Sequence, residues 1–266
     1  MSAPLLEIVG LDVAFGERRV VRDFAVAVAP GERVGLVGES GSGKSLSARA
    51  LIGLLPKGAR AQAASYRFDG AAFDPALPST LARLRGRGIA MVLQDPKYSL
   101  NPTMTAGAQI AEVCGRSRAL ALLAEVGLGE PERVFDQYPG ALSGGMGQRV
   151  MIAMMLAAEP KLLIADEPTS ALDVTVANGV LALLDRIVAA RRMALLFISH
   201  DLDLVGQFCD RVLVMYAGRV VERLAARALD NATHPYTRGL LACRPRLDAP
   251  LGPLATLTRD PSWGAA

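Results

Sequence analysis

The spacing of apolar and polar residues predicts an alternation of strands and helices. Short β-branched runs bounded by turn signals predict strands over residues 6–13, 20–28 and 33–37. Further along, the apolar runs 162–165 and 194–199 flank a segment of helical pattern at 174–191. Strands that are apolar throughout and alternate with helices indicate a buried, mostly parallel sheet, so the predicted fold class is α/β.

The middle of the chain breaks this alternation. It has three stretches of helical composition and no convincing strand, and the helical stretches are 106–114, 119–126 and 148–158. Prolines recur toward the C-terminus, which predicts that regular structure thins there. We therefore expect a core of residues 1–94 and 159–225, a helical insertion at 95–158 and a C-terminal extension at 226–266.

Composition excludes several classes of protein without naming a partner. The 266 residues are 51% hydrophobic and 21% charged, which is typical of a globular chain. A formal net charge of +3 does not favour nucleic-acid binding, so no nucleic-acid partner is expected. Three widely spaced cysteines fit a reducing compartment better than a disulfide framework. The N-terminus lacks the pattern of a secretion signal. The most apolar stretch, 150–165, is interrupted at 159–161 and cannot supply the roughly 20 apolar residues of a membrane span.

A glycine-rich segment lies between the strand predicted at 33–37 and a helix predicted at 45–55. It matches the pattern G-x-x-x-x-G-K-[ST] in full, with Gly38, Glu39, Ser40, Gly41, Ser42, Gly43, Lys44 and Ser45. In this context successive backbone N–H groups and the helix N-terminus point at one anion. Lys44 is expected to reach the β- and γ-phosphates of a nucleotide, and the Ser45 hydroxyl to bind Mg²⁺. The alternative is a glycine-rich turn with a chance lysine.

The apolar run at 162–165 ends in two carboxylates. Asp166 is placed to hold Mg²⁺, mainly through the water shell of the ion. Glu167 is expected beside the γ-phosphate, where an attacking water must be polarised. Taken alone, the pair also fits an exposed strand end. A phosphate-binding loop needs such a partner strand, and this favours the catalytic interpretation.

A second glycine-rich segment precedes the helix predicted at 148–158. Here Ser143, Gly144 and Gly145 offer backbone N–H groups and one hydroxyl to an anion. Ser143 alone also fits an ordinary helix N-cap. Because one nucleotide does not need two such cradles in one chain, we expect a head-to-tail dimer. The Ser143 segment of each copy would close over the γ-phosphate held by the Lys44 loop of the other.

Together these segments resemble the ATP-binding-cassette (ABC) ATPases. Residues 38–45 resemble the Walker A motif of that family, 162–167 its Walker B motif and 142–146 its LSGGQ signature, with Met in the last place. The other motifs also have counterparts in this chain: Gln94 for the Q-loop glutamine, Asp173 in the D-loop segment 170–173, and His200 for the switch histidine. Phe15 resembles the aromatic residue that stacks on adenine, with a core phenylalanine as the alternative.

The resemblance implies a P-loop NTPase (RecA-like) core with an N-terminal antiparallel β subdomain and an inserted α-helical subdomain. It implies an ATPase that uses ATP and Mg²⁺. The catalytic set is Glu167, His200, Gln94 and Lys44, and the metal set is Ser45, Gln94 and Asp166. Asp173 would couple the two sites of the dimer. His200 follows a predicted strand end, where it could bind the γ-phosphate or orient Glu167. The alternative for His200 is a structural histidine, and the alternative for Gln94 is an exposed loop glutamine.

Finer features resemble one branch, the ATPases of oligopeptide, dipeptide and nickel importers. Residues 94–102 resemble its QDPxxSLNP segment, 142–149 its LSGGMRQRV and 234–237 its HPYT. Gly147 departs from the branch, which usually has arginine there. The tail has only Cys243 and lacks the cysteine cluster of many longer members, so no iron–sulfur centre is expected. The insertion also looks short for the branch, which could alter its contact with membrane subunits.

The branch implies an importer ATPase at the cytoplasmic face of the bacterial inner membrane. Its expected partners are two integral membrane permease subunits, a second ABC ATPase subunit of the same or another kind and, indirectly, a periplasmic or extracellular solute-binding protein. The cargo stays open between peptides, nickel and a related small solute. Two alternatives remain: a soluble ABC ATPase without a transport function, and a weakly active partner in a heterodimeric ATPase pair.

Overall fold

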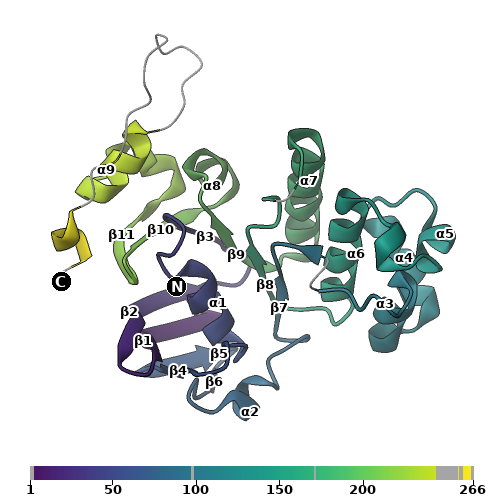
Figure 1. Cartoon of the computed structure of the whole chain (residues 1–266), viewed down its shortest axis with the longest axis horizontal. Helices are drawn as coiled ribbons and strands as arrows, with labels where there is room; N and C mark the ends of the chain where they lie inside the picture. The colour runs from purple at the N-terminus through teal and green to yellow at the C-terminus, as the bar shows by residue number, and fades with distance from the viewer. Residues whose placement is uncertain (1–2, 97–98, 171, 244–256, 258–259, 265–266) are drawn as a thin grey trace, which may run out of the picture. The chain divides into compact units, whose positions relative to one another are not determined.

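The chain divides into two compact units, each discontinuous in sequence. The computed structural model describes residues 3–96, 99–170, 172–243, 257 and 260–264. The first unit comprises Met1–Val28, Arg33–Pro78 and Phe197–Ala266, and the second Ala29–Glu32 and Ser79–Leu196. Figure 1 labels their elements.

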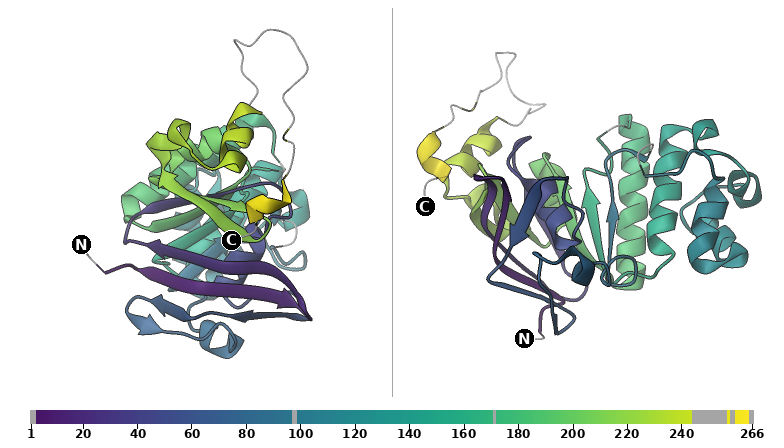
Figure 2. Two further views of the ribbon diagram at one scale, coloured as in Figure 1. Left: turned by 90° about the vertical axis from the view of Figure 1, so that its left-hand side faces the viewer. Right: turned by 60° about the horizontal axis from the view of Figure 1, so that its bottom comes forward.

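An antiparallel sheet begins the first unit. Its strands are β1 (Leu6–Phe15), β2 (Arg18–Val28), β4 (Ala59–Gln62), β5 (Ser65–Phe68) and β6 (Ala71–Ala72). They lie in the order β2-β1-β5-β6, with β4 also paired to β1; β1 and β2 are the two long purple strands in the left view of Figure 2. Alternate residues of β1 are buried, and helix α1 (Lys44–Leu51) packs against β1 and β2. The predicted antiparallel β part is therefore confirmed.

The first unit also contains strands of the parallel type. Strand β10 (Arg211–Tyr216) pairs in parallel with β3 (Arg33–Val37) and antiparallel with β11 (Arg219–Ala225). Helix α8 (Leu202–Phe208) packs against β3, β10 and the 3₁₀ helix η3 (Ala226–Asn231). The elements α9 (Pro235–Ala242) and η4 (Pro261–Gly264) follow.

The second unit is built on buried parallel strands. Every residue of β7 (Ile89–Val92) and β8 (Leu162–Asp166) is buried, and the two strands pair in parallel. The boundary between the units falls inside β9 (Ala194–Ser199). The strand order is β11-β10-β3-β9 in the first unit and β9-β8-β7 in the second. The α/β class with a mostly parallel sheet is thus confirmed.

Helices make up the rest of the second unit. After α2 (Pro78–Leu81), they are α3 (Ala106–Cys114), α4 (Arg116–Glu125), α5 (Pro131–Phe135), the 3₁₀ helix η2 (Pro139–Ala141), α6 (Gly144–Leu156) and α7 (Val174–Arg191). Helices α3, α4 and α5 pack on one another, α3 and α4 pack on α6, and α6 packs on α7, as Figure 1 shows. Across the described residues, we find no helix with the length and apolar character needed to cross a membrane.

Most of the predicted elements are confirmed, and the differences are local. Helix α6 begins at Gly144 instead of residue 148, because the Ser143 hydroxyl caps it and Gly144, Gly145 and Gly147 are part of the helix. Strands β4, β5, β6, β7, β10 and β11 were not predicted as individual elements. The expected thinning toward the C-terminus falls largely on 244–256, outside the described residues, and α9 precedes that segment.

Candidate nucleotide-binding and catalytic site

The segment 38–45 forms a tight loop between β3 and α1 in the first unit. Gly38, Gly41 and Gly43 have φ of 151°, 82° and 105°, in the region that favours glycine. A Cβ atom on Gly38 would lie 2.1 Å from the carbonyl oxygen of Met215 on β10. Only glycine fits there, so the chain leaves β3 along a path fixed by the neighbouring strand.

Lys44 folds its side chain into this loop. Its side chain is buried, and its Nζ donates to the carbonyl oxygens of Gly38 at 2.7 Å and Glu39 at 2.9 Å, with Ser42 Oγ at 3.5 Å. Ser45 is the second residue of α1. The loop places the lysine and the hydroxyl at a helix N-terminus, as a phosphate-binding site requires.

The turn between β10 and β11 supports the loop from outside. The N–H of Gly218 donates to the carbonyl of Ser42 at 3.0 Å, and the Gly218 carbonyl accepts from the N–H of Arg22 at 2.8 Å. A Cβ atom on Gly218 would lie 2.2 Å from the carbonyl oxygen of Val20. Sequence reasoning missed this support because it depends on a hairpin far along the chain.

His200 and Phe15 also belong to the first unit. His200 is exposed in the turn between β9 and α8. That turn is held by Ser199 Oγ, which accepts from the Asp201 N–H at 3.0 Å, and by the Asp201 carboxylate, which caps α8. Phe15 ends β1 with 36% of its surface exposed, so it is not a core phenylalanine. An exposed ring can stack on a base.

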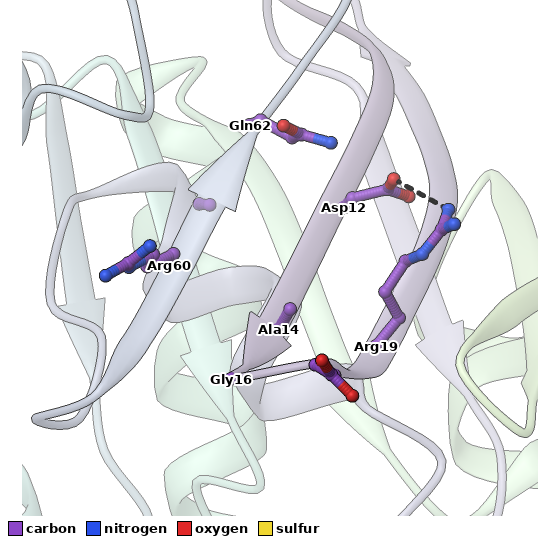
Figure 3. A pocket seen from close by; sticks show the side chains of 8 residues that line it. Asp12, Ala14, Gly16, Arg19, Arg60 and Gln62 are labelled. Carbon is purple, nitrogen blue, oxygen red and sulfur yellow. Dashed lines mark hydrogen bonds and ion pairs between the residues drawn. The ribbon is translucent and has the colours of Figure 1, made fainter.

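A cavity of about 350 Å³ lies on the antiparallel sheet beside the turn between β1 and β2. Figure 3 shows Asp12, Arg19, Arg60 and Gln62 around it, with the Asp12–Arg19 ion pair at 3.4 Å. The residues of the loop 38–45, all of them described, do not line it. This cavity is therefore separate from the predicted phosphate site.

The two predicted carboxylates lie in the second unit at the end of β8. Asp166 is the last residue of the strand, with 4% of its surface exposed. Glu167 follows with φ of 46°, an unfavourable left-handed conformation for a residue with a side chain. Its carbonyl accepts from the Ser170 N–H at 3.3 Å and from the Ser170 hydroxyl at 3.1 Å. Glu159 and four other non-glycine residues of the described chain also have positive φ, so this conformation by itself assigns no role to Glu167.

The second glycine-rich segment begins α6 in the same unit. Ser143 Oγ accepts from the Met146 N–H at 3.3 Å, so it does form the N-cap that was the alternative interpretation. A hydroxyl that accepts in a cap can still donate its own hydrogen. Asp173 in turn caps α7 by accepting from the Val176 N–H at 3.0 Å. A Cβ atom on Gly145 would lie 2.5 Å from Val176 Cγ1, so the starts of α6 and α7 touch.

Gln94 and Gly147 are linked through the segment that follows β7. Gln94 is exposed two residues after the strand. Pro96 is buried, and its Cγ would lie 3.3 Å from a Cβ atom on Gly147. Because residue 147 is glycine, the segment that contains Gln94 and Pro96 lies directly on α6. A larger side chain at 147 would contact Pro96.

Gly145→Ala should lower the free energy of unfolding by about 1–3 kcal/mol, because the added methyl group overpacks the contact with the stiff side chain of Val176. Thermal unfolding checks the effect. Gly144→Ala is the matched control, since its Cβ would meet Leu172 at an ordinary 3.5 Å. Equal stability of the two variants would contradict the close contact between α6 and α7.

The structure assembles the predicted residues in two sets. Phe15, the loop 38–45 and His200 belong to the first unit, and the second holds Gln94, the segment 143–145, Asp166, Glu167 and Asp173. The positive φ values of the loop and its basic side chain fit a phosphate. In the second unit, a buried aspartate at the end of an apolar strand fits a hydrated Mg²⁺ ion. These features define a P-loop nucleotide-binding protein.

Comparison with known proteins identifies the family. The model of the family described as "ABC transporter" matches residues 21–170, and the chain belongs to that family. It is 44% identical to a putative peptide import ATP-binding protein of Brucella abortus (strain 2308), over 96% of this chain and 82% of that protein. It is also 44% identical to the dipeptide transport ATP-binding protein DppD of Escherichia coli (strain K12), over 95% of this chain and 82% of DppD.

Solved structures agree with this assignment. The chain is similar to cbiO1 of Clostridium perfringens, part of the ABC transporter complex cbiONQ, with a TM-score of 0.72, 26% identity and coverage of 86% of this chain and 92% of that one. It is also similar to a dimeric ATP-binding cassette in a post-hydrolysis state bound to ADP and Pi, with a TM-score of 0.70, 26% identity and coverage of 84% and 99%. The chain is an ABC ATPase.

Proposed function

We propose that this ABC ATPase couples binding and hydrolysis of MgATP to the import of peptides through separate membrane subunits. The observation that carries the proposal is the similarity, over almost the whole chain, to proteins named for peptide or dipeptide import. Two integral permease subunits in the inner membrane and a second cassette at its cytoplasmic face would complete the transporter. A solute-binding protein outside that membrane would deliver the peptide.

In the proposed site, phosphate is bound by the loop 38–45. Its N–H groups and Lys44 hold the β- and γ-phosphates, and Phe15 stacks on the adenine. Mg²⁺, when bound, neutralises charge on the phosphate oxygens and is held by Ser45, Gln94 and Asp166. In this proposal these residues belong to a nucleotide-binding core of residues 1–94 and 159–225. Residues 95–158 form the helical part that contacts the permeases, and residues 226–266 form a C-terminal extension.

Hydrolysis in this proposal depends on residues from distant parts of the sequence and from both copies. Glu167 polarises the attacking water, and His200 orients Glu167 or binds the γ-phosphate. Ser143, Gly144 and Gly145 of the opposite copy offer N–H groups and the Ser143 O–H to the same phosphate. Within each copy, Asp173 caps α7 next to the segment 143–145. A movement of that segment therefore reaches Asp173 through the close approach of Gly145 to Val176 in the same copy. This contact supports a coupling role for Asp173.

Co-purification tests the transport role. The tagged chain, solubilised from membranes of its native host in mild detergent, should bring down two multi-span subunits, with or without a second cassette ATPase. Peptide uptake by that assembly would then be compared with uptake of nickel. Recovery only in the soluble fraction with ribosomal or DNA-associated partners would overturn transport while leaving the ATPase chemistry intact.

A further inference from the structure

One peptide unit at the start of the phosphate loop is held at both of its ends. The carbonyl oxygen of Gly38 accepts from Lys44 Nζ at 2.7 Å, and the N–H of Glu39 in the same peptide donates to the hydroxyl oxygen of Tyr236 at 3.0 Å. Because a peptide unit is planar, fixing both groups fixes the orientation of the plane. Lys44 belongs to the loop, whereas Tyr236 comes from α9 in the C-terminal extension.

The position of the Tyr236 hydroxyl is itself well defined. The side chain is fully buried, with its ring centroid 4.5 Å from that of Tyr216 and 6.0 Å from that of Trp263. Packing of this kind leaves the ring few rotamers, so the hydroxyl is presented to Glu39 at little further cost in entropy.

The start of α9 is tied to the core by a second set of contacts. Glu222 Oε1 on β11 accepts from the N–H of Thr233 at 2.6 Å, from its hydroxyl at 3.0 Å and from the N–H of His234 at 3.1 Å. Burial acts to raise the pKa of Glu222, but the Thr237 side chain and these hydrogen bonds outweigh it and hold the pKa below its ordinary value. His234 Nδ1 then caps the helix by accepting from the Tyr236 N–H at 3.2 Å.

Nucleotide binding requires a change at one end of the peptide. Lys44 has to turn from the carbonyls of Gly38 and Glu39 to reach a phosphate, while the bond from Glu39 to Tyr236 does not lie in its way. We propose that Tyr236 is a positioning residue of the nucleotide site, whose hydroxyl keeps the Gly38–Glu39 peptide in place when Lys44 moves to the phosphates. This inference rests on the proposed role of the loop in ATP binding.

The same contact makes the C-terminal extension responsive to nucleotide. If docking of Tyr236 favours the binding-competent loop, ATP must favour docking of α9 by the same factor, because coupling between two sites is reciprocal. Trp263 is the single tryptophan of the chain and lies 6.0 Å from the Tyr236 ring, so its fluorescence reports on this cluster.

Tyr236→Phe in the full chain tests the inference, because it keeps the ring and removes only the hydroxyl group that accepts from Glu39. The Kd for MgATP should rise about 3- to 10-fold, in line with the loss of one hydrogen bond. The KM should rise with it, while kcat at saturating ATP stays within about 2-fold, as expected when an interaction common to ground and transition states is lost. Tyr216→Phe is the matched control: its hydroxyl donates to the Asp260 carbonyl at 3.4 Å, in the same cluster, and its removal should leave the Kd unchanged.

The outcomes separate this inference from the role of the loop. Failure of the parent chain to bind ATP would overturn both. ATP binding by the parent and by Tyr236→Phe with equal Kd would overturn the positioning role alone, whatever happens to thermal stability. If Tyr236→Phe does not fold, the parent chain provides the test: addition of MgATP should slow hydrogen exchange in α9 and change the fluorescence of Trp263. An unchanged exchange rate and spectrum would overturn the inference.

Discussion

Glu167→Gln should bind MgATP with the affinity of the parent chain while its turnover falls by about 100-fold or more. Glutamine keeps the size of the side chain and its ability to accept a hydrogen bond, but it cannot take up the proton of an attacking water. Removal of a general base costs typically 10²- to 10⁴-fold in rate. The readouts are the Kd for MgATP and the steady-state release of phosphate.

The chain offers a matched control for this change. Glu159 also has left-handed backbone geometry, with φ of 55° against 46° for Glu167. Its ion pair with Arg118, at 3.7 Å between two largely exposed side chains, contributes little to stability. Glu159→Gln should therefore hydrolyse ATP at the parental rate. Parental turnover in Glu167→Gln would remove Glu167 from the catalytic role.

Strong local signals made part of the fold predictable. The strands at β1, β2 and β3 were recognised because β-branched runs end at glycine and proline, and α3 was bounded by Thr105 and Gly115. Strand β7 was missed because a run of four apolar residues is too short to tell a strand from a helix by periodicity, even though Gly88 directly precedes it. Helix α6 was placed too late because three glycines lower helix propensity at its start, whereas the Ser143 cap and packing against α7 outweigh that cost.

The site was predictable where one segment carries its own chemistry. The loop 38–45 directly follows the strand end at Val37 and contains the glycines, the lysine and the helix start in eight consecutive residues, and the structure has each of them in the expected element. The contacts that hold the loop are between distant segments: Gly218 reaches Ser42, and Tyr236 reaches Glu39 across 197 positions. The HPYT segment was noticed as a resemblance, but no pattern in the sequence assigns its tyrosine to the loop.

Lys44→Ala should raise the Kd for MgATP by about 10- to 150-fold, which corresponds to the loss of a hydrogen bond to a charged group. Unlike Glu167, Lys44 is expected to contact phosphate before the reaction, so binding itself is weakened. The variant also removes the donor that holds the Gly38 and Glu39 carbonyls, so its unfolding temperature without ligand serves as a separate readout.

Lys57→Ala is the control, since Lys57 is exposed in the turn after α1 of the same unit. The measurements are equilibrium binding and the rise in unfolding temperature on adding MgATP, which depends on the ratio of ligand concentration to Kd. The parent chain and Lys57→Ala should show the same rise, and Lys44→Ala a much smaller one at the same concentration. Unchanged affinity in Lys44→Ala would mean that the buried ammonium serves the loop carbonyls alone, and the phosphate-binding role of residues 38–45 would have to be abandoned.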